Sequence, residues 1–212
     1  MKALLVNGSP KARDSASGSI LDSLAAALGP GMETRRLRAI TAKEAEPADL
    51  EAEVLVLAFP LYVDSLPAPL LEWLLSYAAL ARARGATARP AAVYAICNCG
   101  FLEGAQTETA LAIVRNFARS SGLRWGGAIG LGGGGMFEPM AKLPPEAAIK
   151  RPVSRAMDWL AGLIRGGEAP GEARYAQFAF PRLAYILAAH LGWRRQARAN
   201  GLRPREIGKR LA

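Results

Sequence analysis

The first seventeen residues constrain the fold of this chain more than any other stretch. Residues 3–6 form an uninterrupted apolar run, which is typical of a strand buried on both faces of a sheet. A turn follows at residues 7–10, then a polar segment, and then apolar residues at helical spacing. That helical stripe comprises Ile20, Leu21, Leu24 and Leu28. A strand, a short loop and a helix in this order predict the topology of an α/β protein.

The polar segment is a candidate anion site. It carries the side chains of Lys11, Arg13, Ser15 and Ser17. The first-turn amides of a helix lack partners within the helix, and its dipole is positive at that end, so a phosphate is favoured there. The alternative is that Ser17 only caps the helix while the other polar residues face water.

Three further apolar runs repeat the alternation of strand and helix. They cover residues 54–59, 91–97 and 125–131, and residues 32–40 predict a more charged strand near a sheet edge. We therefore expect an α/β fold with a doubly wound, five-stranded parallel sheet of order 2-1-3-4-5. Ligands of such sheets bind beyond the carboxyl ends of the strands, which selects the loops 8–17, 60–67 and 98–104.

Length and composition agree with a protein that has one main core. The chain has 212 residues, of which 51% are hydrophobic, enough to bury a full core. No apolar run reaches the roughly 18 residues of a membrane span, and the chain opens directly into a predicted strand, so we expect a cytoplasmic protein without a signal peptide. Cys97 and Cys99 are too close in sequence for a disulfide framework and form no metal-ligand pattern, so we expect free thiols and no metal site.

The net charge of +9 lies mostly after residue 150. Such a patch can attract nucleic acid, an anionic membrane surface or acidic ligands, or it can simply keep the surface soluble. No nucleic-acid-binding motif accompanies the charge, which favours the last reading and predicts no nucleic-acid partner.

The three selected loops resemble those of the flavodoxin-like NAD(P)H-dependent oxidoreductases, the FMN reductase family. Residues 7–11 read Asn-Gly-Ser-Pro-Lys and are followed by Ser15-Ala16-Ser17, which is similar to the family's phosphate loop. Residues 60–63 and 66–70 are similar to its second loop, and residues 98–101 to its third. Three positions depart from the family pattern: Ala16 replaces the usual asparagine, Ser17 a threonine, and Glu72 stands close to a common lysine.

The resemblance implies an enzyme that binds FMN and takes electrons from NAD(P)H. The acceptor would be a quinone, an azo or nitro compound, or a free flavin, and no catalytic side chain is expected because the cofactor supplies the chemistry. The phosphate would be held by Ser9, Lys11, Ser15 and Ser17. The ring would be framed by Pro60, Leu61, Tyr62, Val63, Asn98, Cys99, Gly100 and Phe101. The family further implies a homodimer, and the alternatives are a non-enzymatic electron carrier, an interaction protein, or a scaffold that has lost FMN.

Two other sequence features give weaker evidence for function. Gly130, Gly132 and Gly135 satisfy G-x-G-x-x-G, but they follow the last strand, and a Pro-rich segment comes next; this favours a flexible or close-packed turn. His190, the only histidine, lies among apolar residues and is expected to be structural or exposed.

The C-terminal part is predicted to be a separate extension. We expect a flavodoxin-like FMN-binding domain at residues 1–168 and a basic, aromatic, helical extension at residues 169–212. The extension is too apolar to be left uncovered, so we expect it to pack on the protein and to border a homodimer. A membrane surface is the less favoured partner, because the arginines cluster after Trp193.

Overall fold

A six-stranded parallel sheet forms the centre of the computed structural model, with order β2-β1-β3-β4-β5-β6. The structure describes residues 1–11, 14–85, 91–140, 142–203, 206 and 208, without the side chain at position 138. The strands are β1 (Lys2–Asn7), β2 (Glu33–Arg38), β3 (Val54–Pro60), β4 (Ala92–Asn98), β5 (Arg124–Leu131) and β6 (Glu172–Ala176). The predicted order of the first five strands is confirmed, and a sixth strand is added at the edge.

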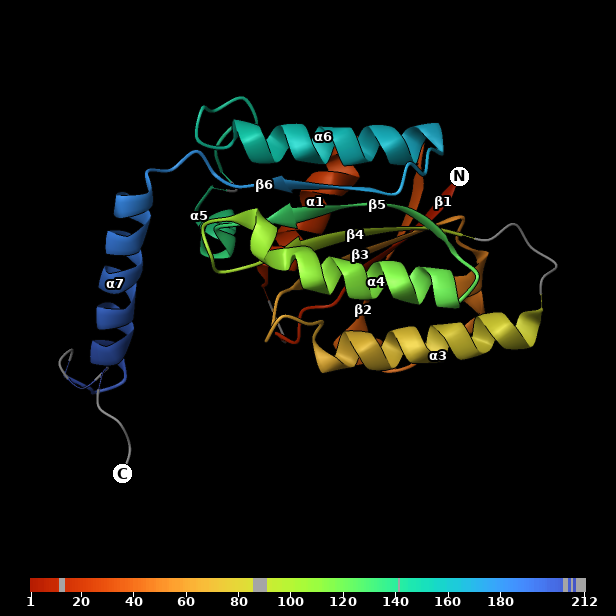
Figure 1. Cartoon of the computed structure of the whole chain (residues 1–212), viewed down its shortest axis with the longest axis horizontal. Helices are drawn as coiled ribbons and strands as arrows, with labels where there is room; N and C mark the ends of the chain where they lie inside the picture. Colours follow the sequence, from red (N-terminus) through yellow and green to blue (C-terminus); the bar gives the residue numbers. More distant parts are fainter. Residues whose placement is uncertain (12–13, 86–90, 141, 204–205, 207, 209–212) are drawn as a thin grey trace. The chain divides into compact units, whose positions relative to one another are not determined.

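Helices connect the strands and cover both faces of the sheet (Figure 1). The α-helices are α1 (Ala16–Leu28), α2 (Ala39–Ala42), α3 (Ala68–Arg84), α4 (Glu108–Ser120), α5 (Phe137–Met140), α6 (Arg151–Gly166) and α7 (Arg182–Ala199). Short 3-10 helices are η1 (Pro47–Glu51), η2 (Gly104–Thr107) and η3 (Gly134–Met136). Among the residues described, no helix has the length and apolar character needed to cross a membrane.

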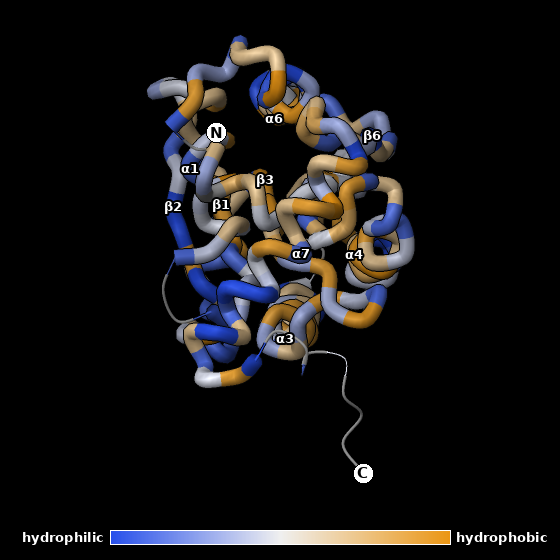
Figure 2. Tube along the Cα trace, turned by 90° about the vertical axis from the view of Figure 1, so that its left-hand side faces the viewer, coloured by the Kyte–Doolittle hydropathy of each residue, from blue (hydrophilic) through white to orange (hydrophobic). Residues whose placement is uncertain are grey.

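Alternation along each buried strand divides the core into two layers. In β1, Ala3 and Leu5 face α1 and α6, while Leu4 and Val6 face α3 and α4. Both sets are buried, which is why the strand reads as a continuous apolar run. Figure 2 shows the contrast with β2, a hydrophilic edge strand beside the apolar inner strands.

A sixth strand lies beyond residue 168, the predicted end of the first domain. β6 pairs with β5 from Gly127 and Glu172 to Leu131 and Ala176, and Phe178 is buried in the core. The first compact unit is therefore Met1–Phe178, and the second is Ala179–Ala212. The first unit ends about ten residues after residue 168, where the first domain was expected to end. β6 escaped prediction because it is a short, exposed, charged edge strand with no apolar run.

Candidate functional site

The three predicted loops meet at one edge of the sheet. The amide of Gly8 donates to the carbonyl of Ala58 at 2.8 Å, which joins the ends of β1 and β3. The amide of Leu61 donates to the carbonyl of Asn98 at 2.8 Å, which joins β3 to β4. Parallel strands place their carboxyl ends together, so loops far apart in sequence become neighbours at the point where the strand order reverses.

The first loop presents two serine hydroxyls beside the start of α1. Ser15 is the N-cap residue, and its Oγ accepts from the amide of Gly18 at 3.1 Å and from Asn7 Nδ2 at 3.2 Å. Ser9 is buried, and its Oγ accepts from the amide of Lys11 at 3.3 Å. A hydroxyl that only accepts still has its hydrogen to donate. Within the described part of the chain, Ser9 and Ser15 therefore retain O–H donors for an anion.

Ser17 is arranged differently from the other two serines. It is 1% exposed, and its Oγ donates to Asn98 Oδ1 at 3.0 Å. The hydroxyl thus ties α1 to the end of β4 in the core, and what Ser17 offers at the helix start is its backbone amide. The helix-capping alternative falls on Ser15 instead, two residues earlier.

Among the described residues, Lys11 and Arg38 place two cations at this loop, and of these the sequence had indicated only Lys11. The side chain of Lys11 is exposed. Arg38, at the end of β2, donates from Nη2 to the carbonyl of Lys11. Arg38 also lines an open hollow of about 380 Å³ together with Asn7, Ser15 and Gly18, and the carboxylates of Asp14 and Asp22 line the same hollow. Arg13, a further candidate cation, lies outside the described residues.

Arg38 could have been found from the strand order. β2 pairs with β1 in parallel, and Asn7 is opposite Arg38 in the register. Any residue at the end of β2 therefore lies beside the loop that follows β1.

The second loop contains a strained two-residue hairpin. Tyr62 and Ser65 exchange backbone hydrogen bonds of 3.1 and 3.0 Å, and the residues between them, Val63 and Asp64, have φ of 49° and 55°. Positive φ at both central residues is the pattern of a type I′ turn, which favours asparagine and glycine. A β-branched valine in this conformation is a genuine outlier, and such strain gathers at ligand-binding sites.

The hairpin also exposes apolar side chains at the edge of the site. Val63 is 98% exposed and Tyr62 is 45% exposed, whereas Pro60 and Leu61 are half-buried. Phe101 of the third loop is 57% exposed. Exposed apolar and aromatic side chains on the loops at the carboxyl edge suit a flat apolar ligand.

Backbone hydrogen bonds from the chain that follows β5 hold the third loop in position. The amide of Gly133 donates to the carbonyl of Phe101 at 2.6 Å, and the amide of Gly134 donates to the carbonyl of Cys99 at 2.7 Å. Gly100 is exposed at the turn. Asn98 and Cys99 are buried, so at these positions the outward-facing surface comes from their neighbours.

Glycines make the approach of these two segments possible. A Cβ built on Gly132 would lie 1.9 Å from the carbonyl oxygen of Leu102, and one on Gly130 would lie 2.2 Å from Thr107 Oγ1. A Cβ on Gly135 would meet nothing within 4 Å. Gly132, just after β5, is thus close-packed as expected, whereas Gly130 is close-packed within β5 and not in a turn. The segment after them is not merely Pro-rich, because η3 and α5 come first.

Neither Cys97 nor Cys99 is activated as a nucleophile. Burial raises the pKa of Cys97, with Cys99 adding to the effect, and burial also raises the pKa of Cys99. Cys99 Sγ lies 3.6 Å from the carbonyl oxygen of Glu103 and 3.8 Å from that of Phe101, as a weak donor. Since the thiolate is the reactive form, both groups are inert near neutral pH.

We expect alkaline pH to destabilise the protein through these thiols. In the unfolded chain they lose their protons near the ordinary pKa of 9.0, while the folded state retains them to higher pH. The contribution of each thiol to the free energy of unfolding is complete below pH 9.0. It decreases above pH 9.0, by at most about 1.4 kcal/mol per pH unit. Urea unfolding at a series of pH values tests this, and Cys97→Ala should flatten the decline above about pH 9. Identical slopes in variant and wild type would contradict it.

His190 is exposed on α7 and packs edge-on against Trp193, with ring centroids 5.5 Å apart. Within the described ranges, no group of three or more His, Cys, Asp or Glu side chains is arranged to hold a metal ion.

Comparison with known proteins finds relatives by structure but not by sequence. Neither a protein-family model nor a curated protein sequence matches the chain. A flavodoxin from Streptococcus pneumonia TIGR4 superposes with a TM-score of 0.56 at 14% identity, over 79% of this chain and 99% of that one. An NAD(P)H:quinone oxidoreductase from Methanothermobacter marburgensis gives 0.53 at 16% identity, over 79% and 96%.

A third structure is an FMN-dependent NADH-azoreductase from Bacillus anthracis in complex with FMN. It gives a TM-score of 0.50 at 13% identity, over 78% of this chain and 100% of that one. Identities this low establish the arrangement of the chain and not its activity. The chain therefore has the flavodoxin-like fold that these flavodoxin and reductase structures share, as the resemblance of its three loops implied.

Proposed function

We propose that this protein is an FMN-dependent NAD(P)H oxidoreductase that reduces a quinone, an azo or nitro compound, or a flavin. The observation that carries the proposal is the meeting of three loops at the β1/β3 switch point, where hydroxyl donors and a strained apolar hairpin adjoin the start of α1. That position is where open α/β sheets bind their ligands.

The residues of the first loop fit a phosphate group. The free O–H donors of Ser9 and Ser15, the first-turn amides that include Ser17, and the charge of Lys11 would hold the dianion. Arg38 would add a second positive charge from the neighbouring strand. Ala16 supplies no side-chain contact, but its backbone amide belongs to the same helical turn.

The second and third loops fit a flat aromatic ring. Pro60, Leu61, Tyr62 and Val63 would form one wall, and Phe101 would form part of the other. Asn98, Cys99 and Gly100 would border the ring's edge, with Gly100 at the surface, because the side chains of Asn98 and Cys99 are buried. The carbonyls of Asn98 and Cys99 already accept from Leu61 and Gly134. Strain at Val63 and Asp64 is consistent with a hairpin kept in position for a ligand.

The chemistry supplied by bound FMN is acceptance of hydride from NAD(P)H and delivery of two electrons to a second substrate. The chain's own residues bind the phosphate, orient the ring and leave one side open at the exposed hairpin. No side chain is required as a general acid or base, which agrees with two buried thiols whose pKa values are raised by burial.

Reduction by nicotinamide cofactors tests the enzyme reading. The full-length protein, saturated with FMN and mixed anaerobically with NADPH or NADH, is expected to lose the blue absorbance of its flavin in a stopped-flow experiment. Flavin that binds but is reduced by neither nucleotide would favour an electron carrier. Protein that takes up no FMN would favour a scaffold without cofactor and would overturn the proposal.

We also propose that the second unit contributes to a homodimer in the cytoplasm. Its helix α7 exposes Leu183, Leu187, Leu191 and Trp193, each more than half exposed. A row of apolar side chains of this size is normally covered by another protein surface.

Removal of Ala179–Ala212 is therefore expected to abolish dimerisation while the first unit stays folded. The cut belongs after Phe178, because a cut after Gly171 would remove β6 from the sheet. Light scattering coupled to gel filtration measures the mass, and circular dichroism checks the fold. Leu187→Ser combined with Leu191→Ser in the full chain should have the same effect, and a truncated chain that remains dimeric would contradict the assignment.

A further inference from the structure

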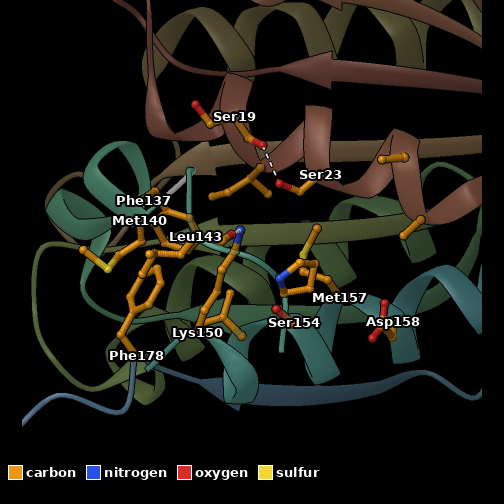
Figure 3. A pocket seen from close by; sticks show the side chains of 15 residues that line it. Ser19, Ser23, Phe137, Met140, Leu143, Lys150, Ser154, Met157, Asp158 and Phe178 are labelled. Carbon is orange, nitrogen blue, oxygen red and sulfur yellow. Dashed lines mark hydrogen bonds between the residues drawn. The ribbon is translucent and has the colours of Figure 1, made fainter. Parts of the chain in front are cut away.

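A second cavity lies between α1 and α6, and of its lining residues Ser19 also lines the hollow beside Arg38. Its volume is about 480 Å³, inside the range of about 300–1,000 Å³ that is usual for small-molecule sites. It follows α1 from Ser19 to Ala27, beyond the helix start that the proposed cofactor would use. Figure 3 shows its lining side chains, which come from α1, from α6, from the segment that connects β5 to α6, and from Phe178 after β6.

The walls of this cavity are mainly apolar. Ile20, Val153 and Met157 are buried core residues that also line it. Phe137 and Phe178 close one end and pack edge to face, with ring centroids 5.0 Å apart. Methionine side chains such as Met157 adapt to ligands of varied shape. A ligand here would be held largely by its apolar body.

A positively charged group lies within these mainly apolar walls. Lys150 is half-buried, and Figure 3 shows its side chain directed into the space that the labelled residues surround. Its Nζ donates to the carbonyl of Leu143 at 3.0 Å, and no ion pair involves it among the side chains that the structure describes. An ammonium has three donors, so two remain for a ligand.

The remaining polar groups make the two ends of the cavity differ in charge. Ser154, one helical turn after Lys150, is a neutral hydroxyl beside it. Asp158 comes two turns after Lys150, about 12 Å from it along the helix axis. Negative charge is thus favoured at the Lys150 end and disfavoured at the Asp158 end.

We propose that this cavity is a binding site for a small amphiphilic anion, with its carboxylate at Lys150 and Ser154 and its hydrocarbon or aromatic body along Ile20, Val153 and Met157. Apolar burial supplies most of the affinity, and the ammonium fixes the orientation. The site uses no residue that the proposed cofactor needs. Its test is therefore independent of FMN.

Isothermal titration calorimetry with dodecanoate on the full-length protein tests the proposal. The wild type should bind in a saturable manner at one site, and Lys150→Met should raise the Kd about tenfold or more, as expected for one lost hydrogen bond to a charged group. Ser154→Phe, which fills the cavity, should abolish binding. Dodecyltrimethylammonium, which has the same apolar chain and the opposite charge, should bind at least about tenfold more weakly than dodecanoate.

The matched control is Arg155→Met, which removes one positive charge from the exposed side of the same helix. Its Kd for dodecanoate should equal that of the wild type. The absence of saturable binding, equal affinity in wild type and Lys150→Met, or equal affinity for the cationic chain would each overturn the proposal. Lys150→Met replaces one half-buried, long side chain by another, so we expect this variant to fold. Its Kd for dodecanoate therefore tests the proposal even if Ser154→Phe does not fold.

Discussion

Gly132→Ala is expected to lower the free energy of unfolding by about 3 kcal/mol, because the new methyl group would overlap with backbone. The built Cβ lies 1.9 Å from the carbonyl oxygen of Leu102, 2.6 Å from its carbonyl carbon and 2.7 Å from the amide nitrogen of Gly104. Backbone cannot rotate away as a side chain can, so the end of β5 and the third loop must separate.

Urea denaturation of Gly132→Ala and of Gly135→Ala measures this effect with a control only three residues away. Gly135 has no heavy atom within 4 Å of a built Cβ and no positive φ, so its substitution should leave stability within about 0.5 kcal/mol of the wild type. Equal stability of the two variants would show that the segments are not packed as described. Because Gly133 and Gly134 support the third loop, we also expect Gly132→Ala to weaken FMN binding.

Ser9→Ala combined with Ser15→Ala is expected to raise the Kd for FMN by about 100-fold or more. Both hydroxyls have an unused O–H donor at the start of α1, and each hydrogen bond to a charged group contributes about 1.5–3 kcal/mol. Fluorescence quenching during FMN titration measures the affinity. Riboflavin, which lacks the phosphate, should bind the variant and the wild type alike.

Two further variants separate phosphate binding from helix capping. Ser15→Thr keeps both the cap and the hydroxyl, so the Kd for FMN should stay near that of the wild type. Ser23→Ala removes an exposed hydroxyl of the same helix and should have no effect. An unchanged Kd in the double variant would exclude the first loop as the phosphate site.

Ser17 is expected to behave unlike Ser9 and Ser15, and the sequence did not separate the three. All three are serines in one polar segment, but Ser17 is buried against Asn98, a residue 81 positions away in the chain. A contact of that kind depends on how α1 lies against β4. Local spacing therefore indicated which residues enter the loop and left open which of their atoms face outward.

The sequence pattern also predicted neither the position of Arg38 at the site nor the hairpin at residues 62–65. Arg38 belongs to a strand so charged that its last residue did not stand out, and it enters the site only because β2 pairs with β1. Val63 disfavours positive φ, so nothing in the sequence predicts a type I′ turn there. The turn forms because the surrounding structure determines its backbone against local preference.

The sequence by itself determined the class of fold, the order of the first five strands and the three loops at their carboxyl ends. Buried parallel strands must be apolar on both faces, and this leaves a pattern that can be read locally. Only the tertiary structure decided the sixth strand, the interlocked glycines, the neighbours of Arg38 and the cavity beside Lys150. Each of these depends on pairing or packing between segments distant in sequence, and no local pattern records which segments become neighbours.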